Sequence, residues 1–276
     1  MDTLPNAATS LYGIIGHPVK HSLSPLLHNS AFQALNLNNV YLAFDVTDLK
    51  SAMKGTRALN IKGLSVTIPH KEAIIKFLDE VDPVTQKIGA VNTVINKNGR
   101  LLGTNTDWIG AIKALEEAVG RLDTKKVLVL GAGGSAKAIV AGLTERGAKV
   151  LIANRTLEKA KDLAEEFEAK WYNFDELPDV EASVLVNATS VGMAPNEDES
   201  LVPPELLSKY SAVMDIVYSP LKTKLLKDAE KAGCRVINGL RMLLFQAVAQ
   251  FELWTATPAP LEVMERTLYK AIGHNK

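Results

Sequence analysis

Apolar positions recur along this chain with two different spacings. Short apolar runs typical of buried strands alternate with stretches in which apolar residues return every three or four positions, as on one face of a helix. In the N-terminal part, strands are expected at 11–16, 40–46 and 63–67, and helices at 24–35, 48–59 and 69–79. Parallel strands need crossover connections, so this alternation predicts an α/β domain with a mostly parallel sheet.

A hairpin and a second alternation follow. Residues 90–96 and 100–104 are separated by Lys97-Asn98-Gly99 and are predicted to form a hairpin on the first sheet. Beyond a helix at 108–121, where the domain boundary is expected, the pattern repeats. Its strands are expected at 126–130, 149–153, 184–187, 212–217 and 235–237, and its helices at 134–146, 157–167, 241–254 and 260–272.

Composition narrows the class of protein. The chain has 276 residues, of which 47% are hydrophobic, enough for two cores. The 31 basic residues balance the 31 acidic ones, so no net field favours nucleic acid or a membrane surface. The single cysteine, Cys234, the lack of a signal-like start and the absence of a long apolar run indicate a cytoplasmic protein.

A glycine-rich turn follows the buried run Val127–Leu130. Its pattern, Gly-x-Gly-x-x-Ala from Gly131 to Ala136, opens a predicted helix. Gly131 permits a tight turn, and Gly133 lets the backbone approach a pyrophosphate at the helix N-terminus. Such a turn could simply connect two elements, but the flanking strand and helix favour dinucleotide binding.

The end of the next strand discriminates between the two nicotinamide cofactors. NAD sites usually place a carboxylate there for the ribose 2′-hydroxyl, whereas this chain has Asn154-Arg155-Thr156. The guanidinium of Arg155 can hold a 2′-phosphate, which favours NADP. The alternative is that Arg155 is an ordinary solvated surface charge.

Polar clusters in the N-terminal half suggest a ligand site. Ser22 and Ser24 follow a strand, although Ser24 before Pro25 could merely cap a helix. Lys71 falls in the first turn of a predicted helix, where its positive charge is disfavoured, so the amine could carry a proton or be an idle surface group. Asp107 could likewise be a helix cap.

Eight segments together resemble, in order, the motif series of shikimate dehydrogenase over about residues 11–255. They are 16–29, 65–71, 89–93, 103–110, 131–136, 154–156, 215–220 and 239–254. The resemblance implies reversible reduction of 3-dehydroshikimate to shikimate with NADPH, in the pathway to chorismate and the aromatic amino acids. It also implies an oxidoreductase that needs no metal, has no nucleic acid or membrane partner, and is a monomer or a homodimer.

The resemblance assigns roles to individual residues. Lys71 and Asp107 would be the catalytic pair. The substrate would be held by Ser22, Ser24, Thr67, Asn92, Tyr218 and Gln246, together with Asp107. The NADP site would be formed by Gly131, Ala132, Gly133, Gly134, Ser135, Asn154, Arg155, Thr156, Ile216 and Gly239. Gln246 could instead face solvent, and Tyr218 could be a core residue with a wet tip.

Because Gln246 lies beyond the nucleotide-binding segment, the substrate domain is expected to be discontinuous. It would comprise residues 1–107 plus 241–276, and a Rossmann-type NADP domain would span 108–240, with an active-site cleft between them. Three alternatives remain: a quinate/shikimate dehydrogenase of broader specificity, a non-catalytic NADP-binding sensor, and a folate- or amino-acid-dehydrogenase relative. The last would have no use for the Ser22/Ser24 and Thr67/Lys71 segments.

Overall fold

A computed structural model describes residues 4–273 and divides the chain into two compact units. The first unit holds the residues up to Thr106 and those from Gln246 onward, and the second unit is Asp107–Phe245. The chain leaves the first unit at the start of helix α5 (Thr106–Val119) and returns to it within helix α9 (Gly239–Thr255). Each unit is built on one six-stranded sheet with helices, which confirms the predicted α/β class.

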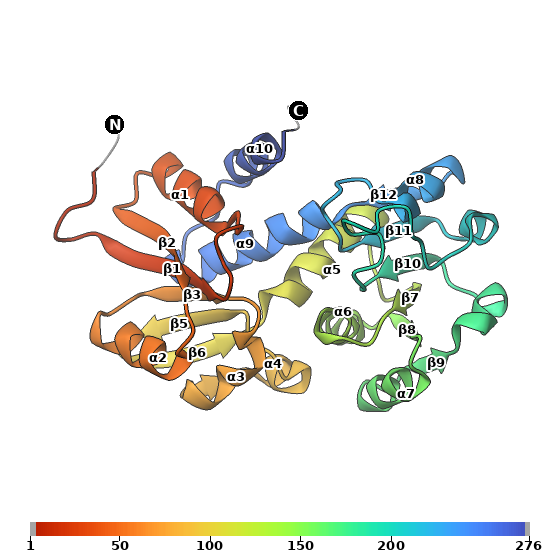
Figure 1. Ribbon diagram of the computed structural model, residues 1–276, viewed down its shortest axis with the longest axis horizontal. Coiled ribbons are helices and arrows are strands. Elements are labelled where there is room, and N and C mark those ends of the chain that lie inside the picture. Colours follow the sequence, from red (N-terminus) through yellow and green to blue (C-terminus); the bar gives the residue numbers. More distant parts are fainter. Residues whose placement is uncertain (1–3, 274–276) are drawn as a thin grey trace. The chain divides into compact units, whose positions relative to one another are not determined.

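The sheet of the first unit has the strand order β2-β1-β3-β5-β6-β4 (Figure 1). Its strands are β1 (Ser10–Gly16), β2 (Asn39–Asp45), β3 (Gly63–Val66), β4 (Glu80–Val81), β5 (Thr93–Lys97) and β6 (Arg100–Thr104). β1 pairs in parallel with β2 and β3, and β4 with β6. β5 and β6 form the predicted hairpin, which joins the sheet antiparallel to β3.

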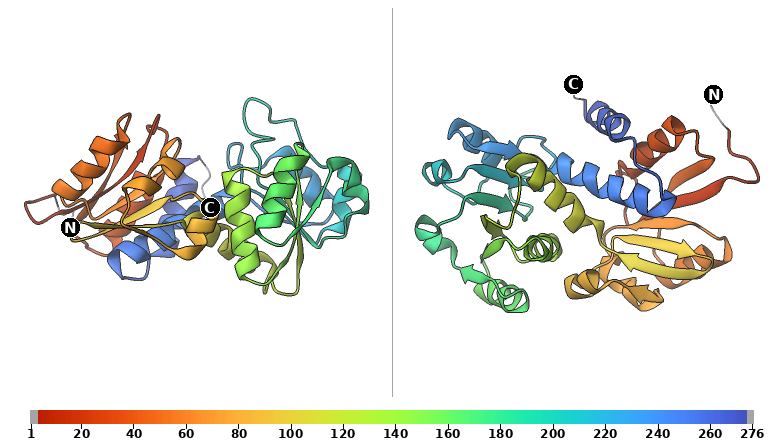
Figure 2. Two further views of the ribbon diagram at one scale, coloured as in Figure 1. Left: turned by 90° about the horizontal axis from the view of Figure 1, so that it is seen from below. Right: turned by 180° about the vertical axis from the view of Figure 1, so that it is seen from behind.

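Helices from both ends of the chain complete the first unit. α1 (Ser24–Ala34) and α10 (Leu261–Ala271) lie side by side (Figure 2), and α2 (Leu49–Ala58) follows β2. Between α1, the sheet and α9 the core is largely aromatic. His28 stacks on Tyr41 with ring centroids 4.5 Å apart, and Tyr12 and Trp254 pack tilted at 5.5 Å.

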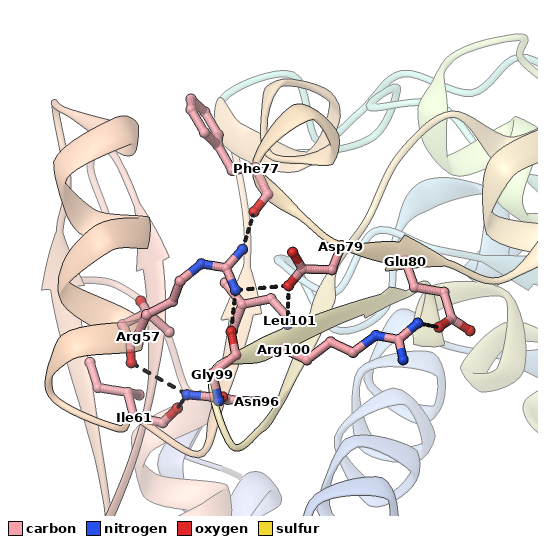
Figure 3. Close-up of polar contacts among 10 residues, drawn as sticks. Arg57, Ile61, Phe77, Asp79, Glu80, Asn96, Gly99, Arg100 and Leu101 are labelled. Carbon is pink, nitrogen blue, oxygen red and sulfur yellow. Dashed lines mark hydrogen bonds and ion pairs between the residues drawn. The ribbon is translucent and has the colours of Figure 1, made fainter.

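The guanidinium of Arg57 holds the turn of the hairpin in place (Figure 3). Arg57, in the last turn of α2, donates to the Asp79 carboxylate at 2.8 Å, to the Phe77 carbonyl at 3.0 Å and to the Gly99 carbonyl in the hairpin turn. The same carboxylate accepts from the amide of Leu101 at 2.6 Å. The side chain therefore ties α2, the segment before β4 and the hairpin together.

The helix predicted at 69–79 is wrong in extent. The structure has a single turn, α3 (His70–Ala73), then a 3-10 turn, η1 (Ile75–Phe77). Helix formation stops because the following residues pair with the hairpin, where the Asp79 amide donates to the Leu101 carbonyl at 2.9 Å. β4 and the short helix α4 (Pro83–Ile88), neither of which was predicted, follow this stretch.

The second unit has a fully parallel sheet in the order β12-β11-β10-β7-β8-β9. Its strands are β7 (Lys126–Leu130), β8 (Lys149–Ala153), β9 (Lys170–Tyr172), β10 (Val184–Asn187), β11 (Ala212–Asp215) and β12 (Arg235–Ile237). The chain winds outward in one direction from β7 and in the other from β10. This is the Rossmann-type order, and the change of direction between β7 and β10 is the usual place for a dinucleotide.

Three helices and two 3-10 segments connect these strands. They are α6 (Gly134–Glu145), α7 (Leu157–Glu166), η2 (Phe174–Asp179), η3 (Pro204–Lys209) and α8 (Lys224–Lys231). β9 and α8 were not predicted. α8 is nevertheless well specified, since the Thr223 side chain caps it and Leu225, Leu226 and Ala229 are buried.

Candidate active site

One edge of the first sheet gathers most of the residues predicted to bind substrate. β1, β3 and β6 end at this edge, and the antiparallel β5 begins there. The segments that follow or precede these strand ends carry the residues in question: Ser22, Ser24, Thr67, Lys71 and Asn92. Residues from 22 to 92 in the sequence thus meet along one line of strand termini.

The two serines have different surroundings from those expected. α1 begins at Ser24 itself, and its N-cap, Leu23, makes no side-chain capping bond, so the capping role considered for Ser24 is wrong. Instead, the hydroxyl of Ser22 accepts from the Ser24 amide at 3.2 Å. Ser24 is buried and Ser22 half-buried.

The Thr67–Lys71 turn is fixed from three directions. The Thr67 amide donates to the Ile15 carbonyl at 3.0 Å, and the Lys71 carbonyl accepts from the Val91 amide at 2.8 Å. Between them, the buried His70 ring contacts the Val46 carbonyl through Nε2 at 2.8 Å. Because α3 has only four residues, its dipole acts on Lys71 far less than the long helix predicted at this position would.

Asn92 joins the hairpin to the start of α5. Its Oδ1 accepts from the amide of Thr106 at 2.7 Å, and its Nδ2 donates to the Thr106 hydroxyl at 3.1 Å. Asp107 is the next residue, in the first turn of α5 rather than before it, so the capping role considered for Asp107 is also wrong. Asp107 is half-buried and is the first residue of the second unit.

One face of α9 runs along β3. Trp254 Nε1 donates to the Val94 carbonyl at 3.0 Å and its ring covers Gly63, while one turn earlier Gln250 Oε1 accepts from the Ser65 hydroxyl at 2.8 Å. Four helix residues and two strand residues both span about 6 Å, so the next residue on this face, Gln246, is at the level where β3 ends. Gln246 is buried, which rules out the solvent-facing alternative.

In the second unit, Gly131 closes a tight turn after β7. Its φ is +112°, and a Cβ there would meet the Thr189 methyl at 2.9 Å and the Ala188 carbonyl oxygen at 3.2 Å. Gly133 has an ordinary φ of −89°, and a Cβ on Gly133 or Gly134 would meet nothing within 4 Å. The loop is therefore open above the N-terminus of α6, where Ser135 is also exposed and Ala132 half-buried.

The tip of β8 presents a free cation. Arg155 is exposed, and among residues 4–273 its side chain forms no ion pair or hydrogen bond. Asn154 braces the turn by donating to the Thr156 carbonyl at 2.9 Å, and Thr156 is the N-cap residue of α7. The turn is ordered without using the guanidinium.

A buried carboxylate lies beneath the segment after β11. Asp215 is fully buried and accepts from the Val217 amide at 3.0 Å, from Asn187 Nδ2 at 3.0 Å and from the Thr223 hydroxyl at 2.7 Å. Burial raises its pKa to about 6. In the sequence, Asp215 was noted only as the start of segment 215–220 of the resemblance. An aspartate at the end of an apolar strand could itself have indicated a buried carboxylate.

Three residues that follow Asp215 in the sequence were expected to contact ligands: Ile216 and Gly239 the cofactor, and Tyr218 the substrate. A Cβ on Gly239 would meet the Ile216 carbonyl oxygen at 2.2 Å, so only glycine allows this approach of two backbone segments. Tyr218 is 41% exposed, which makes the core-residue alternative wrong. Asp107, Tyr218 and the ten nucleotide-site residues belong to the second unit, and the other predicted residues to the first.

Within residues 4–273, no group of three or more His, Cys, Asp or Glu side chains is arranged to hold a metal ion. No helix in the same range is long and apolar enough to cross a membrane.

Three family models match consecutive parts of the chain. The shikimate dehydrogenase substrate binding domain matches residues 14–94, the shikimate/quinate 5-dehydrogenase model matches 113–211, and the shikimate 5′-dehydrogenase C-terminal domain matches 239–269. The first model lies within the first unit and the second model within the second unit. The third model begins at the end of the second unit and continues into the first.

Whole proteins match over nearly the full length. Shikimate dehydrogenase (NADP(+)) from Pyrococcus abyssi is 49% identical over 265 residues, covering 95% of this chain and 98% of its own. A crystal structure of shikimate dehydrogenase in complex with NADP+ is 44% identical with a TM-score of 0.90, covering 98% of each chain. Shikimate 5-dehydrogenase from Listeria monocytogenes, in complex with shikimate and NAD, is 39% identical with a TM-score of 0.92, covering 97% of this chain and 99% of its own.

Proposed function

The chain belongs to the shikimate dehydrogenase family, and from that premise we propose that it catalyses the reversible NADPH-dependent reduction of 3-dehydroshikimate to shikimate. The observation that carries the proposal is the line of hydroxyl, amide and ammonium side chains at one edge of the first sheet. A small acid bearing several hydroxyl groups needs such fixed donors and acceptors, and a bare scaffold does not.

We assign the substrate to Ser22, Ser24, Thr67, Asn92 and Gln246 in the first unit. Tyr218 and Asp107, from the second unit, complete the proposed set. Ser22 and Ser24 are assigned to the carboxylate, and the amide groups to the ring hydroxyls. Burial of Ser24, Asn92 and Gln246 supports this, because a desolvated polar side chain gains more from a ligand hydrogen bond than an exposed one does.

NADP is assigned to the loop of residues 131–135 and to the turn of residues 154–156. The loop fits a pyrophosphate, since Gly133 and Gly134 leave room at the N-terminus of α6, where backbone amides point outward. The unpaired guanidinium of Arg155 fits a ribose 2′-phosphate, and Ile216 and Gly239 fit the nicotinamide end. When bound, the reduced nicotinamide supplies a hydride to the ketone carbon.

Lys71 and Asp107 are assigned to the proton. Reduction of the ketone leaves negative charge on its oxygen, and the ammonium of Lys71 would protonate that oxygen as the charge develops. In the oxidative direction, the neutral amine would take the proton back from the hydroxyl. The Asp107 carboxylate would orient the ammonium and accept from the same hydroxyl.

One assay tests the proposed function. Shikimate and quinate are each supplied with NADP+ and with NAD+, and the absorbance of the reduced nicotinamide is followed. We expect turnover of shikimate with NADP+ at a kcat/KM well above the other three combinations. Comparable values for quinate would point to the broader quinate/shikimate enzyme, and nicotinamide binding without turnover would point to a sensor.

Two further assignments, of cellular location and of oligomeric state, complete the proposal. We place the protein in the cytoplasm, consistent with a single cysteine that is buried. We expect a monomer or a homodimer, which light scattering after size-exclusion chromatography distinguishes.

A further inference from the structure

A chain of buried hydrogen bonds in the first unit leads to Asn92, one of the proposed substrate residues. On one side, the Tyr41 hydroxyl donates to the Ser65 hydroxyl at 2.6 Å, and Ser65 donates to Gln250 Oε1 at 2.8 Å.

The chain continues on the other side of the same amide group. Gln250 Nε2 donates to the Thr93 hydroxyl at 2.9 Å and to the Asn92 carbonyl at 3.2 Å. Thr93 then donates to Asn92 Oδ1 at 2.7 Å. Tyr41, Ser65, Gln250, Thr93 and Asn92 are each at most 4% exposed, so water does not compete for these bonds.

Two backbone groups fix the direction of every bond in this chain. The Asn92 carbonyl can only accept, which orients the Gln250 amide with its nitrogen toward β5 and its oxygen toward Ser65. The Thr106 amide can only donate, which orients the Asn92 side chain with Oδ1 toward α5. The Asn92 Nδ2 is thereby defined as the donor that a substrate hydroxyl would meet.

We propose that Gln250 is a positioning residue for substrate binding, which acts through Thr93 on Asn92. This inference rests on the proposed function, because Asn92 is taken as a substrate contact. Gln250 is separated by 158 residues from Asn92 and by 185 from Ser65, yet its single amide group forms hydrogen bonds to both residues. Gln250 is 1% exposed and is not among the residues assigned to the substrate or the cofactor.

The test compares KM values for shikimate in variants of the full-length protein. Gln250→Met keeps the volume but removes both arms of the amide, and should raise this KM about tenfold, equivalent to about 1.4 kcal/mol. The KM for NADP+ should stay within about twofold, because the nucleotide residues lie in the second unit. A variant that merely lost active fraction would lower the apparent kcat and leave both KM values unchanged.

Thr93 supplies a second, independent variant. Thr93→Val breaks the chain in its middle and should also raise the KM for shikimate, whereas Thr93→Ser keeps the hydroxyl and should restore it. The double variant Gln250→Met/Thr93→Val should be no worse than the poorer single one, since both interrupt one chain. Thr56→Val is the matched control, because Thr56 is a buried hydroxyl in the same unit that donates only to the Ala52 carbonyl at 2.9 Å.

The KM values separate a failure of the positioning role from a failure of the proposed function. If wild type oxidises shikimate and both Gln250→Met and Thr93→Val keep its KM, the positioning role is refuted and the proposed function stands. Multiplied effects in the double variant, or no rescue by Thr93→Ser, would refute it as well. If wild type binds but does not oxidise shikimate, the proposed function fails and this inference fails with it.

Discussion

A lysine that transfers a proton and a lysine that only faces water respond differently to removal. If Lys71 protonates the ketone oxygen, Lys71→Ala should lower kcat by roughly 10²–10⁴, with a smaller change in the KM for shikimate. Affinity for NADP+ should be nearly unchanged, because Lys71 lies in the first unit. Steady-state kinetics on the folded variant measures these quantities.

Lys76→Ala is the control for this change, since Lys76 lies five residues further on, in η1. It should retain wild-type turnover. Near-wild-type kcat in Lys71→Ala, with the circular dichroism of the native protein, would contradict the proposed proton transfer.

Arg155 offers the second test at the scale of one residue. Its exposed guanidinium forms no bond within residues 4–273, so Arg155→Ala should leave stability unchanged. The KM for NADP+ should rise about tenfold to a hundredfold, as for loss of one charge-assisted contact, while the KM for NAD+ hardly changes.

Lys159→Ala removes another exposed cation, from α7, four positions after Arg155. It should alter neither KM by more than about twofold, since surface charges away from a contact contribute little. Equal losses for both cofactors in Arg155→Ala would mean that this side chain does not recognise the 2′-phosphate.

At the scale of an element, the loop between β7 and α6 contains two glycines that are required for different reasons. Gly131→Ala adds a Cβ at a positive φ, 2.9 Å from the Thr189 methyl, and should lower the free energy of unfolding by about 1–3 kcal/mol. Gly133→Ala meets no protein atom within 4 Å and should leave that free energy unchanged.

For cofactor binding, Gly133 is the more informative of the two glycines, because its replacement leaves the free energy of unfolding unchanged. Gly133→Ala should weaken NADP+ binding measured by calorimetry, because its methyl group would stand where the pyrophosphate approaches. Full NADP+ affinity in the stable Gly133→Ala protein would show that the phosphates bind elsewhere.

These elements also show what could be read from the sequence. The apolar strand and glycine turn at residues 127–136 are local signals, and both the turn and its strand lie where predicted. The helix expected at 69–79 ended early because the hairpin captures its second half, a contact that local pattern does not encode.

The buried chain through Gln250 was missed for a related reason. A glutamine on an apolar helix has no distinctive spacing, and its partners Ser65 and Thr93 are far away in the sequence. By contrast, Ser22 follows the strand predicted at 11–16 and Thr67 ends the strand predicted at 63–67, whereas Asn92, inside the strand predicted at 90–96, was assigned through the resemblance to the family. Their binding roles stay predictions until the variants are measured.

At the scale of the whole molecule, a buried histidine in the first unit and a buried carboxylate in the second unit have pKa values far from their usual ones. Burial lowers the pKa of His28 in the first unit to about 3, and burial raises the pKa of Asp215 in the second unit to about 6. His28 therefore stays neutral when the unfolded chain takes up a proton below about pH 6.5. Asp215 holds its proton in the native state up to about pH 6, whereas in the unfolded chain it does so only below about pH 4.

The two groups give stability opposite dependences on pH. The stability contributed by neutral His28 is present above about pH 6.5 and is lost as the pH falls toward 3, by up to about 1.4 kcal/mol per pH unit. The contribution of protonated Asp215 is present below about pH 4 and is lost as the pH rises toward 6. Denaturant titrations between pH 4 and 8 should show a weaker acid destabilisation in His28→Phe and a stronger one in Asp215→Asn, each relative to wild type. Parallel curves for the variants and wild type would contradict this account.

The chain enters the second unit at Asp107 and leaves it at Phe245, so the two units do not become available at the same time during translation. A ribosome synthesises the second unit as one uninterrupted segment, which can fold on emergence. The first unit, although it begins earlier, has to wait with Ser65 and Thr93 unsatisfied until Gln250 has been synthesised. Its nascent form therefore leaves exposed the largely aromatic sheet face that α9 later covers. For this protein, the unit that is started first is the unit that is finished last.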